Sequence, residues 1–328
     1  YPYQWNWDSA FAALGFAAFD VDRAWTELET LMAGQWQNGM LPHIQFHQED
    51  AGYFPGPGVW GTEGAPGKGA GRVASSGITQ PPVAASFALR TYAKDGATGQ
   101  ERLRALFPRL MKLHRWFMDS RAESGAIAIV HPWESGRDNA PDWDSAMAAF
   151  EPEGVEPYTR RDTGHVDPRM RPTKADYDRY IWLVQFGRCY DSRNLRTGEL
   201  SGCVSNASFL GWWGGLRQGQ PTETLHRVLA DARYAVPSFD PADPRFDSLR
   251  YWRGPVWWVM NMMVSTGLHE AGLTDEAERI RRDTVALIDQ NGFAEYFDPQ
   301  DGTPAGGGTF TWTAAIWLGW ASPTAQER

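Results

Sequence analysis

Residues 274–299, TDEAERIRRDTVALIDQNGFAEYFDP, contain one helix and the loop that follows it, and this pair of elements indicates the fold class. The first part, 274–290, has apolar residues at helical spacing, and Thr274 is placed to cap its start. The second part, NGFAEYFDP, combines glycine, proline and aromatic residues and does not continue the helix. We therefore predict a helix that leads into an aromatic loop carrying Glu295.

The same alternation of helix and long loop recurs along the chain, whereas the alternating pattern of strands is rare. Asp8 is expected to cap one further helix, and Ser205 and Asn206 are expected to cap another. The predicted helices are about 8–19, 21–35, 80–94, 101–120, 174–190, 204–217, 221–234, 255–271, 274–290 and 311–320. The Gly- and Pro-rich stretches are 51–82, 121–143, 235–254 and 291–310. Loops of this length are uncommon in a compact domain unless they carry function.

This pattern predicts an all-α protein in which helical hairpins close into a ring. The chain has no short repeat of the solenoid kind, so a closed ring with its loops gathered over one mouth fits better than an open stack. No Ser/Gly-rich or charged linker divides the chain, and residues 1–328 are therefore expected to form a single domain.

The composition excludes several classes of partner. The net charge is −9 and no basic stripe alternates with the aromatic residues, so nucleic acid is not expected as a partner. No apolar run approaches the ~20 residues of a membrane span and no signal peptide is evident, so a cytoplasmic location is the default expectation. The sequence leaves the oligomeric state open.

Neither a metal nor another cofactor is expected. Cys189 and Cys203 are too few for a disulfide framework or a Cys-rich zinc site, and both are expected to be buried. His43 and His47 are four residues apart, but Gly39 and Pro42 argue against the helix that would align them on a metal. The 17 Trp and 11 Tyr exceed what a core needs, and flat rings with a polar group suit a sugar-binding surface.

Cleavage of a glycosidic bond needs one protonated carboxyl group and one ionised carboxylate. The segment HPWESGRDNAPDWD, residues 131–144, places four acids beside Trp133 and Trp143. Repulsion between like charges and desolvation by the indole rings would raise a carboxyl pKa, so one acid could serve as the proton donor. The four acids are Glu134, Asp138, Asp142 and Asp144. The alternative is that Glu134 and Asp144 cap turns and pair with Arg137.

The second acid is Glu295, which lies between aromatic residues in NGFAEYFDP. A carboxylate in such surroundings is costly unless it is used. Asp298 precedes a proline in a turn and is expected to be structural.

Three further segments combine aromatic and polar residues suited to a sugar: YPYQWNWDSAF (1–11), SGITQPP (76–82) and YWRGPVWW (251–258). Each of them alone could be explained by packing, whereas their combination favours a carbohydrate site.

Together, WNWDSAF, HPWESGRDN, YWRGPVWW and GFAEYFDP followed by FTWTAA resemble, in this order, the pattern of glycoside hydrolase family 63. The resemblance is greatest to its bacterial branch of mannosylglycerate and glucosylglycerate hydrolases, and the motifs span almost the whole chain. The resemblance implies an (α/α)6 barrel and hydrolysis with inversion. It assigns the general acid to Asp138 and the general base to Glu295.

The resemblance also implies binding residues. The residues expected around the sugar in the −1 subsite are Trp7, Asp8, Trp133, Trp252 and Trp257. The positions that match the glycerate-type aglycone site are Tyr1, His43, Tyr53, Gln80, Arg171 and Tyr177. Trp5, Gly136 and Tyr251 lie in the same motifs and complete the candidate set. Arg171 is a suitable partner for a carboxylate because its planar fork can bind both oxygens.

The chain departs from the family pattern after residues 177–191, which run directly into SRNLRTGEL. Compared with the family, the sequence lacks helices near residues 191–192 and a segment before Tyr1. Two interpretations stay open: these parts were not included in this chain, or the barrel is reduced. The loop 61–72 is expected to be a mobile lid, with a passive loop as the alternative. The segment 151–171 could be a second lid that brings Arg171 to the substrate on closure.

The resulting prediction is an inverting hydrolase of a small α-glycoside with a carboxylate aglycone. An exo-acting α-glucosidase on oligosaccharides is one alternative, and it would not need Arg171. A non-catalytic sugar-binding protein is another, although the presence of both Asp138 and Glu295 argues against it. A terpene cyclase would need a more apolar pocket. The sequence does not distinguish glucose from mannose.

Overall fold

The computed structural model describes residues 3–48, 50, 53–96, 98–123, 126–148, 151–186 and 202–326. They belong to two compact units. Unit 1 contains Tyr1–Asp138, Ser145–Gly164 and Lys174–Ser201, and unit 2 contains Asn139–Asp144, His165–Thr173 and Gly202–Arg328. Two short segments that lie between parts of unit 1 in the sequence, 139–144 and 165–173, are thus part of unit 2.

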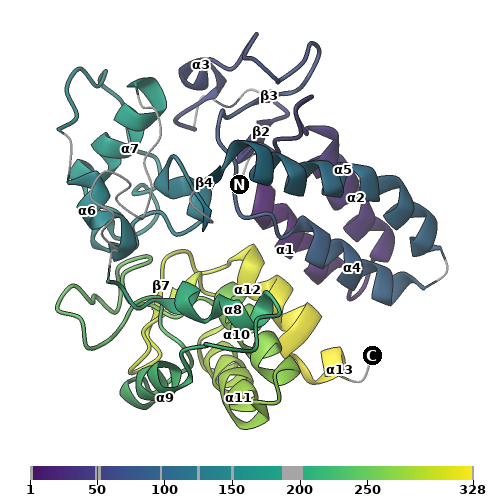
Figure 1. The fold of residues 1–328 in the computed structure, drawn as a ribbon. Helices are drawn as coiled ribbons and strands as arrows, with labels where there is room; N and C mark the ends of the chain where they lie inside the picture. Colours follow the sequence, from purple (N-terminus) through teal and green to yellow (C-terminus); the bar gives the residue numbers. More distant parts are fainter. Residues whose placement is uncertain are drawn as a thin grey trace. The chain divides into compact units, whose positions relative to one another are not determined.

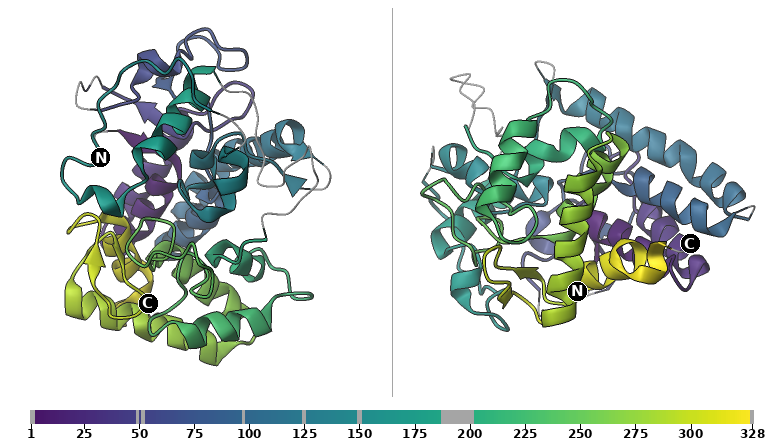
Figure 2. Two further views of the ribbon diagram at one scale, coloured as in Figure 1. Left: turned by 90° about the vertical axis from the view of Figure 1, so that its left-hand side faces the viewer. Right: turned by 90° about the horizontal axis from the view of Figure 1, so that it is seen from below.

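Unit 1 is built on four helices: α1 (Asn6–Phe16), α2 (Val21–Ala33), α4 (Ala84–Asp95) and α5 (Gly99–Ser120). Helix α1 packs against α2 and α4, and α4 packs against α5 (Figures 1 and 2). Asp20 caps α2, because its side chain accepts a hydrogen bond from the Arg23 N–H. A fifth helix, α7 (Lys174–Phe186), carries Tyr177.

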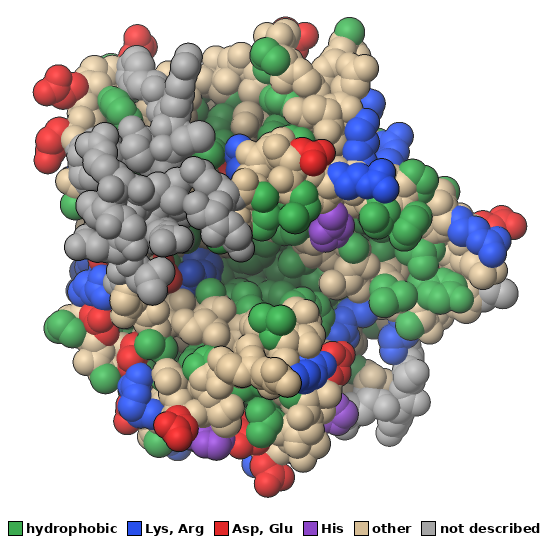
Figure 3. Space-filling view, viewed as in Figure 1, with side chains coloured by type: hydrophobic (Ala, Val, Ile, Leu, Met, Phe, Trp, Pro, Cys, Tyr) green, Lys and Arg blue, Asp and Glu red, His purple; other side chains and the backbone are tan. Residues whose placement is uncertain are grey.

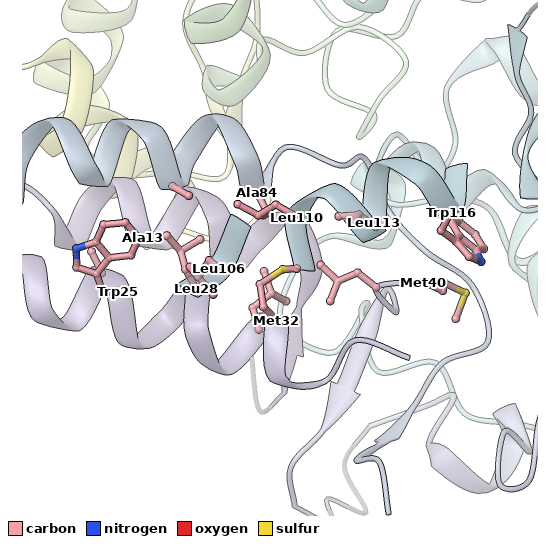
Figure 4. Close-up of a cluster of buried hydrophobic side chains, with 14 of the residues drawn as sticks. Ala13, Trp25, Leu28, Met32, Met40, Ala84, Leu106, Leu110, Leu113 and Trp116 are labelled. Atoms are coloured by element: carbon pink, nitrogen blue, oxygen red, sulfur yellow. The ribbon is translucent and has the colours of Figure 1, made fainter. Parts of the chain in front are cut away.

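The core of unit 1 lies between these helices (Figure 4). Trp25 and Leu28 of α2 and Leu110 of α5 are almost completely buried. Each side chain of this kind contributes about 1.5–3 kcal/mol by leaving water. The Trp25 indole N–H donates to Asp95 at the end of α4 over 2.7 Å, so its polar hydrogen is not left unsatisfied.

Short elements complete unit 1. An antiparallel sheet has the order β1 (Gln4–Trp5), β2 (Ile44–Phe46), β3 (Ala74–Ser75). The remaining elements are α3 (Pro57–Trp60), β4 (Ala122–Glu123), β5 (Ala126–Ile127) and η1 (Pro132–Ser135), with α6 (Asp144–Met147) at the boundary. The sheet joins the chain before α1 to residues 44–46 and 74–75, which flank the 51–72 loop.

Unit 2 is built around its central helix, α10 (Trp258–Glu270). This helix packs against α8 (Leu210–Trp213), α11 (Thr274–Asn291) and α12 (Thr311–Ile316). Figures 1 and 2 show α10 and α11 side by side. Most residues of α10 are buried, as expected for a helix that is apolar on all sides. The other elements are η2 (Pro141–Trp143), η3 (Pro168–Met170), η4 (Asn206–Phe209), α9 (Thr222–Asp231), β6 (Tyr296–Phe297), β7 (Pro304–Ala305), the π-helix η5 (Trp317–Ala321) and α13 (Pro323–Gln326).

Most predicted helices are confirmed, including 274–290, which is α11. The predicted helix 204–217 is wrong in length, because only residues 206–213 are helical before Gly214 and the left-handed Gly215. Residues 187–190 of another predicted helix lie outside the described residues.

The predicted caps are only partly correct. Ser205 is the N-cap of η4, and its N–H donates to Ser208 Oγ. Asp8 and Thr274 were wrong as caps, since α1 already begins at Asn6 and the N-cap of α11 is Leu273.

The surface carries charges of both signs, which are interspersed on the face shown in Figure 3. Among the described residues, no helix has the length and apolar character needed to cross a membrane. Cys203 is a free thiol and half-buried rather than buried, and Cys189 lies outside the described residues.

Candidate active site

The loop that carries Asp138 begins with a buried histidine. His131 caps η1: its Nδ1 accepts from the Trp133 N–H over 3.0 Å, so Nε2 carries the proton and donates to the Tyr180 carbonyl over 3.0 Å. Burial lowers the pKa of His131 to about 4, so the ring is neutral. Tyr180 also donates its hydroxyl to the Asp138 carbonyl over 3.0 Å. Tyr180 of α7 therefore holds this loop at its first residue and at the main chain of the predicted general acid.

Glu134 is the central structural residue of this loop. Its Oε1 accepts from the Thr79 N–H and from Arg121, and its Oε2 accepts from the Val130 N–H, at 2.8–3.1 Å. The carboxylate is completely buried. The alternative pairing with Arg137 is wrong, because Glu134 pairs with Arg121 instead. Glu134 thus joins the acid loop to the 76–82 segment, a role that its position in the sequence did not reveal.

Trp7, Gln80 and Gly136, three predicted binding residues, lie together. The Gln80 Oε1 accepts from the Trp7 N–H over 3.2 Å in the first turn of α1, where backbone donors lack helical partners. Gly136 has a φ of +71°, and a Cβ there would lie 2.2 Å from the Trp7 ring. Only glycine allows the ring and the acid loop this close approach. Asp8 follows Trp7 in the same helical turn.

His43, Trp133 and Tyr177 form a second group. The His43 ring is stacked on Trp133 with centroids 5.9 Å apart, and Tyr177 meets Trp133 at 6.0 Å. Burial lowers the pKa of His43 to about 3, with a smaller electrostatic contribution from His131. Burial raises the pKa of Tyr177. As predicted, the segment around His43 and His47 is not a helix, since strand β2 lies between them.

Trp60 was missed at the sequence level and joins this group. Its ring centroid lies 6.3 Å from that of His43 and 6.2 Å from that of Trp133. Among the described residues, no hydrogen-bond partner is found for its buried Nε1 or for His43 Nδ1. Buried polar groups in this state are costly, and two of them in one ring cluster suit a bound hydroxyl or carboxylate. The aromatic end of the Gly/Pro-rich 51–60 stretch was the available signal.

Trp5 and Tyr53 also lie together, with ring centroids 5.6 Å apart, next to Tyr3 and Phe46. Tyr1, the remaining predicted binding residue of this part of the chain, lies outside the described residues.

The two predicted lids differ in their contacts. The 61–72 loop is anchored, since the N–H groups of Gln37 and Asn38 donate to the carbonyls of Lys68 and Gly67. In the 151–164 segment, Tyr158 stacks on Phe54 with centroids 4.9 Å apart. Closure of either loop stays a prediction.

Glu295 lies in unit 2, directly before strand β6, and is 3% exposed. Its N–H donates to the Gly307 carbonyl over 2.8 Å, and the Gly307 N–H donates to its Oε2 over 3.0 Å. Gly306 has a φ of +72°, and a Cβ there would lie 2.4 Å from Oε2. The glycine-rich turn therefore packs closely against this carboxylate and holds it in place.

Arg171 completes the surroundings of Glu295. Its Nη1 donates to Oε1 over 3.0 Å and its Nη2 to Oε2 over 2.7 Å. The Tyr251 ring lies under the guanidinium at 4.9 Å. Burial alone would lower the pKa of Arg171, but Glu295, followed by Tyr251 and Tyr296, raises it above its ordinary value, so the group stays charged. The sequence identified both partners without indicating that they pair.

The YWRGPVWW segment forms the neighbouring wall. Trp252 and Trp257 are parallel, with centroids 4.0 Å apart, and both are almost completely buried. The Trp257 indole N–H donates to the Tyr251 carbonyl, and the Trp252 N–H donates to Asn139 Oδ1. Arg253 forms a bidentate ion pair with Asp144. Asn139 and Asp144 therefore fix this wall from the segment that follows the predicted acid.

Among the residues that the structure describes, no three His, Cys, Asp or Glu side chains are grouped so that they could hold a metal ion.

The sequence pattern of the "Mannosylglycerate hydrolase MGH1-like glycoside hydrolase domain" matches residues 1–189 and 185–313. The chain belongs to this family of glycoside hydrolases. The resemblance stated from the motifs is thereby confirmed, and the protein is a glycoside hydrolase.

Curated members of the family cover the chain almost completely. The mannosylglycerate hydrolase MGH1 of Selaginella moellendorffii is 39% identical over 401 residues, covering 99% of this chain and 81% of the relative. The mannosylglycerate hydrolase of Thermus thermophilus is 38% identical over 396 residues (98% and 94%), and the glucosylglycerate hydrolase of Mycolicibacterium hassiacum is 31% identical over 411 residues (98% and 92%).

These alignments are longer than the 328 residues of the chain, so the relatives contain residues without a counterpart here. The two ranges of the chain that match the family overlap at residues 185–189.

The fold class is confirmed by a solved member of the family. The chain matches the GH63 mannosylglycerate hydrolase from Thermus thermophilus in complex with Tris and D-glycerate with a TM-score of 0.89 and 37% identity, covering 98% of this chain and 94% of that one. Neutral trehalase Nth1 from Saccharomyces cerevisiae matches with a TM-score of 0.56 at 14% identity, covering 99% and 73%, which supports the fold alone. The predicted (α/α)6 class is therefore correct.

Proposed function

We propose that this family member hydrolyses mannosylglycerate or glucosylglycerate to the free sugar and glycerate, with inversion at the anomeric carbon. The observation that carries the proposal is the buried pair of Arg171 and Glu295. It places an arginine fork, the group best shaped for a carboxylate, directly beside a carboxylate expected to do the chemistry. The relatives are named for substrates with such a carboxylate.

In the proposed mechanism, Glu295 accepts a proton from a water molecule, whose oxygen attacks the anomeric carbon. Asp138 gives its proton to the glycosidic oxygen, and glycerate leaves. A single displacement of this kind requires the two carboxyl groups to lie about 6.5–9.5 Å apart, which leaves room for the water. The Gly307 N–H, bound to Oε2, would keep the base oriented during the reaction.

The sugar would be bound by the residues of the −1 subsite proposed above, with Trp7 and Trp133 offering ring faces. The neutral His43 and the Trp60 N–H would supply hydrogen bonds to hydroxyl groups. Tyr53 and Tyr177 are two further residues that the family resemblance assigns to aglycone binding.

The test is proton NMR of the purified protein with mannosylglycerate and, separately, glucosylglycerate, following the anomeric signals from the first minutes. Prompt release of the β-sugar from either α-glycoside is expected. Early release of the α-sugar would contradict inversion. Turnover of maltooligosaccharides but of neither glycerate glycoside would favour an exo-acting α-glucosidase, and binding without turnover would favour a sugar-binding protein.

A further inference from the structure

The ion pair between Arg171 and Glu295 would prevent Glu295 from accepting a proton from water, as a general base must. Oε1 accepts from Arg171 Nη1, and Oε2 accepts from both Arg171 Nη2 and the Gly307 N–H. A carboxylate has about four lone-pair positions, and three of them are occupied here. If Glu295 accepted a proton from water in this state, the buried guanidinium would lose its counter-charge, which is strongly unfavourable.

Arg171 can be released only to another anion. Its side chain is 9% exposed, and the Tyr251 ring covers one face of the guanidinium at 4.9 Å. Moving the charge away from Glu295 without a replacement would leave it desolvated and unpaired. A carboxylate of the substrate presents the same planar pair of oxygens as Glu295 and can replace it with equivalent hydrogen bonds.

We propose that the carboxylate of the substrate takes Arg171 over from Glu295 and thereby frees the general base only when an acidic aglycone is bound. This inference rests on the proposed function and extends it: Arg171 determines specificity by controlling the base as well as by binding the aglycone. A neutral glycoside then fails at proton transfer even when its sugar is bound.

The anchors around the pair support an exchange of the side chain alone. The main chain before Arg171 is held, because Tyr296 donates its hydroxyl to the Met170 carbonyl over 2.7 Å. Glu295 is held independently, because Gly307 donates to Oε2 and accepts from the Glu295 N–H. When Arg171 leaves, the carboxylate keeps its orientation, and Oε1 becomes the oxygen that has no donor among the described residues. We therefore assign proton acceptance to Oε1.

A substrate without an aglycone separates binding from release of the base. In an α-mannosyl or α-glucosyl fluoride, the bond from C1 to fluorine breaks and fluoride leaves without a proton. The oxygen of water bonds to C1, and one water proton passes to Glu295. The fluoride offers Arg171 no carboxylate, so the wild-type protein should hydrolyse it slowly.

The first measurement is release of fluoride by the wild-type protein with and without 3-hydroxypropionate. This compound is glycerate without its 2-hydroxyl group, which leaves space for the fluorine. It should accelerate the reaction by about tenfold or more, the usual range for coupling between two ligands. The neutral analogue 1,3-propanediol should have no effect. Inhibition or no change with 3-hydroxypropionate would overturn the exchange, and this measurement needs no variant.

The second measurement uses Arg171→Gln. The exchange predicts opposite effects on two substrates: faster hydrolysis of the fluoride than in the wild type, no response to 3-hydroxypropionate, and loss of turnover of the glycerate glycosides. A role in binding alone predicts no acceleration. Arg169→Gln is the matched control, because Arg169 lies on the same segment, is 88% exposed and pairs with Asp167. It should behave as the wild type.

Failure of the inference and failure of the proposed function give different results. Hydrolysis of a glycerate glycoside without activation of the fluoride reaction, and without acceleration in Arg171→Gln, would overturn the exchange and leave the function standing. Turnover of none of these substrates would overturn both.

Discussion

Replacement of Gly306 by alanine is expected to displace the Glu295 carboxylate. The φ of +72° costs a residue with a side chain about 1–2 kcal/mol. The new Cβ would lie 2.4 Å from Glu295 Oε2 and 2.7 Å from the Tyr296 ring, whereas ordinary contact begins at 3.4 Å. Such overpacking costs about 1–3 kcal/mol, so the free energy of unfolding should fall by about 2–5 kcal/mol.

The effect on activity should exceed the effect on stability. Relief of the clash requires Oε2 to move by about 1 Å, and a misplacement of this size costs about 100-fold in rate. Urea denaturation gives the change in stability, and NMR of the glycerate glycosides gives the change in kcat/KM.

Two further glycines separate the causes. Gly292 has the same φ of +72°, with a ψ of −154° that essentially only glycine adopts, and nothing lies within 4 Å of its Cβ position, so Gly292→Ala should show only a backbone cost of about 1–3 kcal/mol. Gly308 has neither a positive φ nor a neighbour within 4 Å, so Gly308→Ala should be nearly neutral. If Gly306→Ala matched Gly292→Ala in both stability and activity, the close packing around Glu295 would be refuted.

Three other predictions follow from the site. Asp138→Asn should lower turnover of the glycerate glycosides by about 10²–10⁴-fold, while calorimetry shows retained binding; undiminished turnover would rule out its role as acid. Glu134→Gln should destabilise the protein by about 3–5 kcal/mol in urea denaturation, since it removes the completely buried carboxylate that neutralises the partly buried Arg121, whereas the exposed Glu270→Gln should cost less than about 0.5 kcal/mol. The pKa values of His43 and His131 in the folded protein are about 3 and about 4, below the ordinary 6.5. As the pH falls below 6.5, both histidines are therefore protonated in the unfolded chain before they are protonated in the folded protein. The free energy of unfolding should decrease from pH 6.5 towards pH 4 by about 1.4 kcal/mol per pH unit for each histidine. His43→Gln should reduce that slope by one such contribution, and an unchanged slope would contradict the neutral, buried state of its ring.

Elements with a clear period or cap could be predicted, and those set by tertiary contacts could not. Helix α11 follows from its own apolar spacing. The start of α1 was misplaced because Trp5 pairs with Ile44 in β1 and β2, and the Asn6 N–H donates to the His43 carbonyl. These partners, which are far away in sequence, make a side-chain cap at Asp8 unnecessary.

The candidate site shows the same division. Asp138, Glu295 and Arg171 could be proposed as single residues because their chemistry suits hydrolysis of an acidic glycoside. Their pairing could not be predicted, since Arg171 and Glu295 are separated by 124 positions and no local pattern joins them. Trp60 and Glu134 depend on burial and on partners that only the folded chain reveals.

The passage of segments 139–144 and 165–173 into unit 2 has a consequence for synthesis of the protein on the ribosome. Asp144 and Arg171 emerge long before their partners Arg253 and Glu295, so unit 2 cannot complete its ion pairs until nearly the whole chain has been translated. A fragment that began at residue 202 would contain Glu295 without the guanidinium that neutralises it. The two halves of the gene therefore cannot be expected to yield independently folding proteins, and attempts to express them separately should give aggregation-prone products.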